Sequence, residues 1–221
     1  TAFEGSDRGV PSLVYLVVIA TGTDDTTALE GGLKAIEKYP IDYLAGPKDV
    51  TDDEMTKLVE WVKAQRAIYR PVKLVKPWKT AGSNDMGIID LDETGMENAA
   101  GEVTAAEYCA RIAGILAGIP MGMSATYAAL PELTAVTDRT TEEQETAIKA
   151  GKLILIHDGL QAKIARAVNS LTTIPPEGKQ DWSRIKIVEG MDLISYYLRT
   201  TIENEYLGRY PNTYDNKQIL V

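Results

Sequence analysis

The sequence predicts an α/β protein with a mostly parallel sheet flanked by helices, followed by a small α+β unit. Up to about residue 150, short apolar runs of strand character alternate with segments of helical period, which is the pattern of strand–helix–strand units. The last third instead combines paired short strand candidates with one long helix. We therefore predict an α/β domain at 1–150 and a C-terminal α+β domain at 151–221, the second of them truncated.

The first apolar run, Ser12–Ala20, has no charged residue and is rich in Val, Leu and Ile, which predicts a strand buried on both faces. A small, polar and acidic stretch at 21–27 is expected to be a loop that leads into a helix. Tyr39 and Pro40 end that helix, because a residue before proline disfavours helical backbone. The apolar positions of that helix are Leu29, Leu33 and Ile36. After the helix, Ile41–Ala45 is a short strand candidate.

Helix starts are marked by three capping boxes, in which a Thr hydroxyl and a Glu three residues later satisfy free amide groups. The boxes are Thr51–Glu54, Thr104–Glu107 and Thr140–Glu143. The second helix is expected to run to about Gly118, before Pro120, and the third to end at Gly151.

Further apolar runs predict additional short strands, with turn residues at 81–84 between the first two. These strand candidates are Val72–Val75, Ile88–Leu91, Lys152–His157, Lys163–Val168 and Arg184–Val188. A long final helix follows, closed by Gly208. The apolar side chains on one face of that helix are Met191, Ile194, Leu198 and Ile202.

Composition excludes several classes of protein. The formal net charge of −9 argues against nucleic acid or an anionic membrane surface as the main partner. The single cysteine, Cys109, cannot form an internal disulfide, lies in an apolar helical pattern, and is expected to be a small buried hydrophobe in a protein made in a reducing cytoplasm. No apolar run is long enough to span a bilayer, and no signal peptide is indicated. The start at Thr1 and the apolar end at 219–221 suggest a fragment.

Candidate catalytic residues are few. The one histidine, His157, precedes Asp158, but no Gly-x-Ser-x-Gly nucleophile motif accompanies the pair. We interpret His157 as a strand-end residue beside a turn, and a catalytic role as the less favoured alternative. We also find no phosphate-binding glycine motif, so the sequence predicts no catalytic and no cofactor-binding residue.

Two acidic clusters could attract a cation, but each has a simpler explanation. One His and one Cys cannot supply a usual zinc site. The first cluster lies at a helix start, where negative charge is favourable, and the second lies at a strand end, where solvated carboxylates are common, although a magnesium site is conceivable. We therefore predict no metal site. The clusters are Asp49, Asp52, Asp53 and Glu54, and Asp90, Asp92 and Glu93.

Two further patterns have structural and functional interpretations. Glycines at 114, 118 and 122 are spaced by four, which favours close helix packing. A loose basic group has aromatic neighbours, so a stacking platform for single-stranded nucleic acid is conceivable, but the net charge disfavours it. That group is Arg66, Arg70 and Lys73, with Trp61 and Tyr69 nearby.

Five stretches, in the right order, resemble the contractile tail sheath proteins of phages and of related prophage or bacteriocin particles. The helix Tyr108–Pro120 ends in Gly-x-Pro, Leu130–Asp138 follows it, and Gly151–Gly159 resembles the start of the family's carboxy-terminal region. The other two stretches are Arg166–Thr173, which reads R-A-V-N-S-L-T-T, and Ile187–Asn204 with the following Tyr206–Arg209.

The resemblance implies a structural subunit of stacked rings around an inner tube, joined to neighbours by exchanged terminal strands, which contracts to drive the tube through the target envelope. It also implies an α/β domain of subtilisin-like topology without protease activity, located in the virion tail. The implied partners are copies of the chain and a tail tube protein, with Met191–Glu205 as the neighbourhood of the tube contact. Two alternatives stay open: an α/β hydrolase-like enzyme with a site near His157 or in the 90–93 cluster, and a soluble adaptor or surface-array protein.

Overall fold

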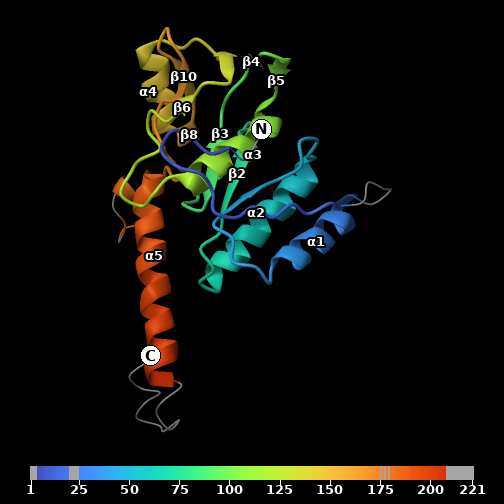
Figure 1. Ribbon diagram of the computed structural model, residues 1–221, viewed down its shortest axis with the longest axis vertical. Helices are drawn as coiled ribbons and strands as arrows, with labels where there is room; N and C mark the ends of the chain where they lie inside the picture. Colours follow the sequence, from blue (N-terminus) through green and yellow to red (C-terminus); the bar gives the residue numbers. More distant parts are fainter. Residues whose placement is uncertain (1–3, 20–24, 175, 177, 179, 208–221) are drawn as a thin grey trace.

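The fold is built around a four-stranded parallel sheet with the order β1-β2-β3-β8 (Figure 1). Its strands are β1 (Tyr43–Ala45), β2 (Lys73–Pro77), β3 (Ile88–Leu91) and β8 (Lys152–Leu153). The computed structural model describes residues 4–19, 25–174, 176, 178 and 180–207 of the chain. The predicted α/β class with a mostly parallel sheet is confirmed.

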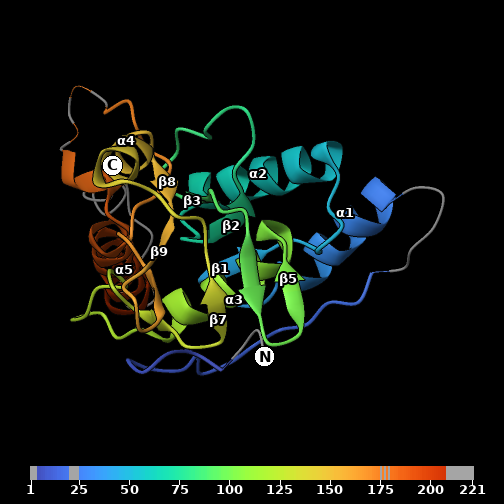
Figure 2. The same cartoon turned by 90° about the horizontal axis from the view of Figure 1, so that it is seen from above.

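Helices cover both faces of this sheet. The helices α1 (Asp25–Ile36) and α2 (Asp52–Ala67) pack together on one face, and α3 (Ala105–Gly118) covers the other (Figure 2). Successive strand side chains point to opposite faces. Leu74 accordingly belongs to the core under α1 and α2, whereas its neighbour Val75 belongs to the core under α3.

Two small antiparallel sheets complete the β structure. One has the order β5-β4-β7 and the other β6-β10-β9. Their strands are β4 (Met96–Asn98), β5 (Gly101–Val103), β6 (Ala129–Leu130), β7 (Leu133–Ala135), β9 (Leu155–His157) and β10 (Ala162–Ile164). The sequence predicted one strand at Lys152–His157, but the chain divides it between two sheets, because the N–H of Leu155 donates to the Glu93 carboxylate at 2.9 Å instead of continuing the parallel ladder.

All three predicted capping boxes are confirmed. They open α2, α3 and α4 (Thr141–Lys149), with the Thr hydroxyl accepting from the Glu N–H and the Glu carboxylate accepting from the Thr N–H. Each of the three Thr Oγ1 to Glu N distances is 3.3 Å. Local hydrogen bonding therefore fixes three helix starts independently of the core.

Three strand predictions need correction. The described part of Ser12–Ala20, residues 12–19, forms no strand, and several of its apolar side chains are exposed. Arg184–Val188 is not a strand either, because α5 (Ile185–Ile202) begins there and its buried Ile185 and Val188 are spaced by three, as on one helix face. β10 ends at Ile164, short of the predicted Val168, which instead forms an isolated bridge with Arg184.

The helix α5 extends away from the rest of the molecule, after the short 3-10 helix η1 (Gln180–Ser183) (Figure 1). A π-helical turn, η2 (Glu203–Leu207), continues it, and the predicted stop at Gly208 lies outside the described residues. No helix in the described part of the chain combines the length and apolar character needed to cross a membrane. The predicted two-domain division stays a prediction, although β8 follows residue 150 and joins the sheet built before it.

Candidate assembly surface

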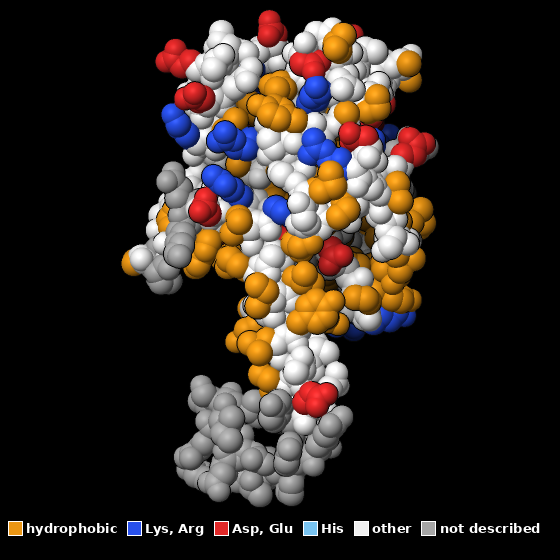
Figure 3. Space-filling view, turned by 60° about the vertical axis from the view of Figure 1, so that its left-hand side comes forward, with side chains coloured by type: hydrophobic (Ala, Val, Ile, Leu, Met, Phe, Trp, Pro, Cys, Tyr) orange, Lys and Arg blue, Asp and Glu red, His pale blue; other side chains and the backbone are white. Residues whose placement is uncertain are grey.

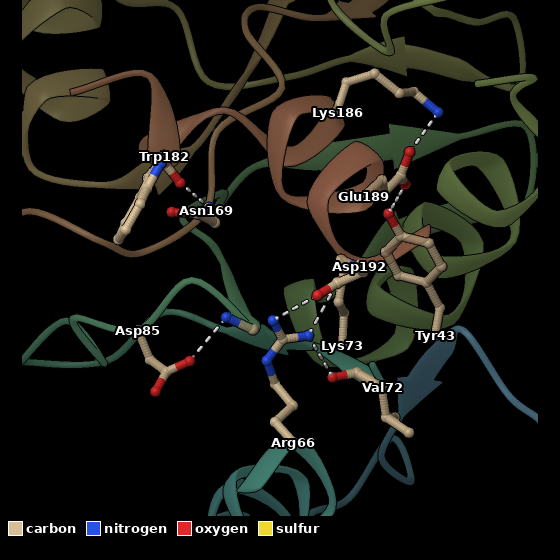
Figure 4. Close-up of polar contacts among 11 residues, drawn as sticks. Tyr43, Arg66, Val72, Lys73, Asp85, Asn169, Trp182, Lys186, Glu189 and Asp192 are labelled. Atoms are coloured by element: carbon tan, nitrogen blue, oxygen red, sulfur yellow. Dashed lines mark hydrogen bonds and ion pairs between the residues drawn. The ribbon is translucent and has the colours of Figure 1, made fainter. Parts of the chain in front are cut away.

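The first half of α5 is tied to the α/β layer by charged contacts. The carboxylate of Asp192 accepts hydrogen bonds from Arg66 on α2, at 3.1 Å from Nη1 and 3.0 Å from Nη2 (Figure 4). The same carboxylate lies 2.7 Å from Nζ of Lys73 on β2. All three side chains are largely buried, so water screens this group weakly. One acid on α5 thus holds two bases from two different elements.

A second charged contact lies one helical turn earlier. Glu189 accepts a hydrogen bond from the Tyr43 hydroxyl on β1 and lies 2.5 Å from Nζ of Lys186 (Figure 4). The Lys186 ammonium also donates to the carbonyl of Ile119, at the end of α3, at 3.1 Å. Burial and the neighbouring Glu189 carboxylate raise the pKa of Tyr43 well above its ordinary value, so Tyr43 stays a donor at any physiological pH. We call these two contacts, centred on Asp192 and Glu189, the α5 joint.

A cavity of about 550 Å³ lies next to the α5 joint, between α5, α2 and the segment that leads into β1. Much of its wall is aromatic or apolar, although charged side chains of the joint also contribute. The apolar lining includes Tyr39, Trp61, Tyr69, Met121, Leu193 and Tyr196. Side chains of the α5 joint therefore form part of the cavity wall, while Ile185 and Val188 at the start of α5 are buried.

Beyond the joint, α5 presents an exposed apolar surface. Ile194 is 69% exposed and Tyr197 is 62% exposed, and orange side chains gather on this projecting helix in Figure 3. The stretch has no charged residue. We define the α5 apolar face as Leu193, Ile194, Tyr196, Tyr197 and Leu198. A helix that is apolar on most sides is normally buried, and a contiguous exposed patch of this kind marks an interaction surface.

His157 is exposed at the end of β9, and its Nδ1 accepts a hydrogen bond from the N–H of Gly159 at 3.1 Å. Asp158 accepts from the N–H groups of Leu160 and Gln161 at 2.9 Å and pairs with Lys163. The hydrogen bond from the Lys163 ammonium, followed by the two backbone hydrogen bonds, holds the pKa of Asp158 far below its ordinary value. The contacts of both side chains thus shape the β9–β10 turn, as the structural interpretation of His157 predicted.

The acidic cluster at 90–93 is separated into three ion pairs. Asp90 lies 2.8 Å from Nζ of Lys76, and Asp92 lies 3.0 Å from Nζ of Lys152. Glu93 is fully buried and lies 2.8 Å from Nη1 of Arg139. Each carboxylate is therefore already compensated by its own base.

The cluster at 49–54 also has local partners. Glu54 belongs to the capping box of α2, and Asp52 pairs with Lys79. Across the described ranges, no three His, Cys, Asp or Glu side chains are grouped so that they could hold a metal ion.

The basic group of the sequence does not form a free patch. Arg66 and Lys73 are used in the α5 joint, and Arg70 donates to Gln65 at 3.2 Å and to the carbonyl of Glu37. Tyr69 lies under the guanidinium of Arg199, 5.6 Å from its ring centroid. The arrangement holds α5 to the α/β layer, and the sequence did not reveal the acidic partner, Asp192.

The predictions for small residues in and after α3 are met in part. A Cβ on Gly118 would lie 2.8 Å from the carbonyl oxygen of Gly9, so the chain does approach closely there. Gly122 has no such neighbour. Cys109 is buried, as predicted, and burial raises the pKa of its thiol far above the ordinary range.

Comparison with known proteins gives a consistent result. Residues 21–170 match the family model described as the phage tail sheath protein central domain. The chain is 32% identical over 205 residues to the tail sheath protein of Clostridium phage phiCD119, covering 93% of this chain and 56% of that protein.

Two solved structures share the fold. The sheath tail protein of Desulfitobacterium hafniense matches with a TM-score of 0.76 and 22% identity, over 91% of this chain and 47% of that one. The helical sheath of the anti-feeding prophage in its contracted state matches with a TM-score of 0.64 and 15% identity, over 88% of this chain and 55% of that one. The chain thus spans about half the length of the relatives that it matches.

Proposed function

This chain belongs to the phage tail sheath family, and we propose that it is a structural subunit of a contractile tail sheath. In this proposal copies polymerise in stacked rings around an inner tube and contract to drive the tube through the target envelope. The family match over residues 21–170 is the observation that carries the proposal, and it favours this function over a hydrolase-like enzyme near His157. The virion tail is the implied location, and synthesis in the host cytoplasm belongs to the same proposal.

A sheath subunit works by repacking rather than by chemistry on a substrate. It needs a stiff body, connections to its neighbours and two packings of similar free energy. The buried parallel sheet between α1, α2 and α3 supplies a stiff body. The proposed subtilisin-like topology and the division into 1–150 and 151–221 are parts of this same proposal.

We assign the α5 apolar face to contact with a neighbouring copy of this chain. The chain carries a formal net charge of −9, so two copies repel each other overall. The segment from Leu193 to Leu198 has no charged side chain, so two acidic subunits can meet there without bringing like charges together. The sheath of the anti-feeding prophage is a helical assembly, which supports a repeated contact of this kind.

The α5 contact is tested with the double variant Ile194→Asp/Tyr197→Asp in the complete gene product. Sedimentation velocity is expected to show large assemblies for the wild type and single subunits for the variant. The matched control is Leu160→Asp, because Leu160 is 91% exposed at the β9–β10 turn, away from α5. Assembly that persists in the double variant contradicts the assignment. Assembly that persists but no longer binds a tube protein would assign the face to the tube instead.

The sheath function itself is tested by electron microscopy of the complete gene product expressed alone. Long hollow polymers are expected. Subunits that never polymerise under any salt or pH condition that keeps them folded would argue against a sheath. The tube protein is the second proposed partner, and co-sedimentation of purified tubes with such polymers checks it.

A further inference from the structure

One of the two edges of the parallel sheet lies at β1, and the other lies at β8. In the part of the chain that the structure describes, β1 pairs with β2 alone, and all three of its residues are only partly buried. In β2 and β3, by contrast, Lys73–Lys76 and Ile88–Leu91 are buried throughout. Parallel strands are normally buried on both faces. The edge at β1 therefore lacks the cover that β2 and β3 have.

A second cavity of about 550 Å³ lies beside this edge. It is bounded by β1, by α1 on one face of the sheet and by α3 on the other. The residues from α1 are Leu29, Gly32, Leu33 and Ile36, and those from α3 are Ala110, Ala113, Gly114 and Ala117. The wall on the α3 side is thus made of small residues, which leave room for large side chains opposite them.

The outer wall of this cavity is the apolar segment that the sequence predicted to be a strand. Its side chains divide into two sets: Val17 and Ile19 lie against Gly32 of α1, whereas Leu16 is 80% exposed and Val18 is 87% exposed. Within the described chain, no backbone hydrogen bond joins residues 12–19 to another segment. Apolar side chains on alternating sides, without backbone pairing to another described segment, are the properties of a strand without a partner.

We propose that residues 14–19 add to β1 as a fifth parallel strand and close this cavity. Val17 and Ile19 would keep their side of α1, and Leu16 and Val18 would turn onto the small residues of α3. Alternation along a strand requires this division, because neighbouring side chains point to opposite faces.

The chain topology supports the same arrangement. With residues 14–19 beside β1, α1 becomes the crossover helix to β1, as α2 is between β1 and β2. When successive strand–helix–strand crossovers have the same handedness and add their strands in the same direction along a sheet, their helices lie on the same face. The helices α1 and α2 do share a face and contact each other. The arrangement in the structure, in which residues 14–19 are unpaired, is then the open state of this segment. The proposed fifth strand is its closed state.

The test compares Leu16→Asp with Leu160→Asp in the complete gene product. Both leucines are at least 80% exposed in the structure. If residues 14–19 stay in the open state, both variants should therefore melt within about 2 °C of the wild type. The closed strand predicts that Leu16→Asp alone melts roughly 10 °C lower, because it places a charge inside an apolar layer. Equal, small shifts for both variants overturn the proposal.

Hydrogen exchange on the wild type decides the question if Leu16→Asp fails to fold. The closed strand predicts that the amides of residues 15–19 exchange at least about 100-fold more slowly than those of an unstructured peptide. Exchange at the unstructured rate overturns the proposal. So does protection that disappears on dilution to single subunits, because it would come from another copy. These results do not depend on whether the assembled protein is a sheath.

Discussion

Asp192 on α5 accepts hydrogen bonds from Arg66 on α2 and lies within 2.7 Å of Lys73 on β2. A single carboxylate thereby connects the projecting helix to the sheet and to one of the helices that cover it. Because the two bases come from segments that are adjacent only in the folded chain, the position of α5 depends on the folded α/β layer.

Removing the charge of Asp192 is expected to destabilise the protein. In Asp192→Asn, Arg66 and Lys73 face each other without a carboxylate, and breaking a largely buried ion pair from one side costs about 3 kcal/mol. Urea unfolding measures the loss. The control is Asp181→Asn, because the Asp181–Arg184 pair is exposed and should contribute less than about 0.5 kcal/mol. Equal losses in both variants would show that the joint adds nothing beyond a surface pair.

The buried pair of Glu93 and Arg139 is expected to be the costliest ion pair to break. Glu93 also accepts from the N–H of Leu155 at 2.9 Å and from the N–H of Thr137 at 3.1 Å, so it joins β9 and the segment after β7 to the segment after β3. Glu93→Gln should lower the free energy of unfolding by about 3–4 kcal/mol. Glu145→Gln, which breaks the exposed pair with Lys149, should change it by less than about 0.5 kcal/mol. A Glu93→Gln variant as stable as the wild type would contradict the structure here.

Gly118 at the end of α3 and Gly122 just after it differ in the space around them, which allows a steric prediction. A methyl group at position 118 would meet the backbone of Gly9 and Val10 at 2.8 Å, whereas one at position 122 meets nothing within 4 Å. Gly118→Ala should therefore cost about 1–2 kcal/mol by overpacking, and Gly122→Ala should be neutral within about 0.5 kcal/mol. Thermal melting of the two variants measures this difference. The reverse order of stability would show that the segment 5–10 does not pack on the end of α3.

Acid sensitivity is expected to depend partly on Glu132. Burial alone would raise the pKa of this carboxyl, but hydrogen bonds from Arg111 at 2.7 Å and from Tyr108 at 2.6 Å outweigh it and lower the pKa below its ordinary value. A carboxyl with a lowered pKa stabilises the fold above its unfolded pKa of about 4.3, and this contribution is lost as the pH falls through the folded-state pKa.

The Glu132→Gln variant tests this dependence. It should be about 1–2 kcal/mol less stable than the wild type at pH 7, and the difference should shrink towards pH 3. Urea midpoints at several pH values measure it, and Glu102→Gln on exposed β5 serves as the control. A difference that stays constant from pH 7 to pH 3 would show that the loss comes from packing rather than from the charge.

Features that depend on local chemistry were predictable from the sequence. The three Thr–Glu boxes begin helices as expected, because their hydrogen bonds lie within four residues. The apolar run at Ile88–Leu91 is a strand with the predicted bounds. The resemblance stretches from Tyr108 onward indicated the family that the comparison confirms.

Features that depend on distant partners were not predictable. Lys152–His157 reads as one strand, and its division follows from the hydrogen bond to Glu93, which lies 62 residues earlier in the chain. Arg184–Val188 fits the strand and helix patterns equally well at that length, and burial of Ile185 and Val188 on one face decides for the helix. Asp192 carries no motif that pairs it with a base, and only the fold brings Arg66 and Lys73 to it.

An image reconstruction of polymers formed by the complete gene product tests the sheath function most directly. We predict a hollow helical sheath in which Ile194 and Tyr197 of each subunit are buried against a neighbouring copy. A sheath in which both side chains face solvent would contradict the assignment of the α5 apolar face. A protein that stays monomeric while it is folded would contradict the sheath function itself.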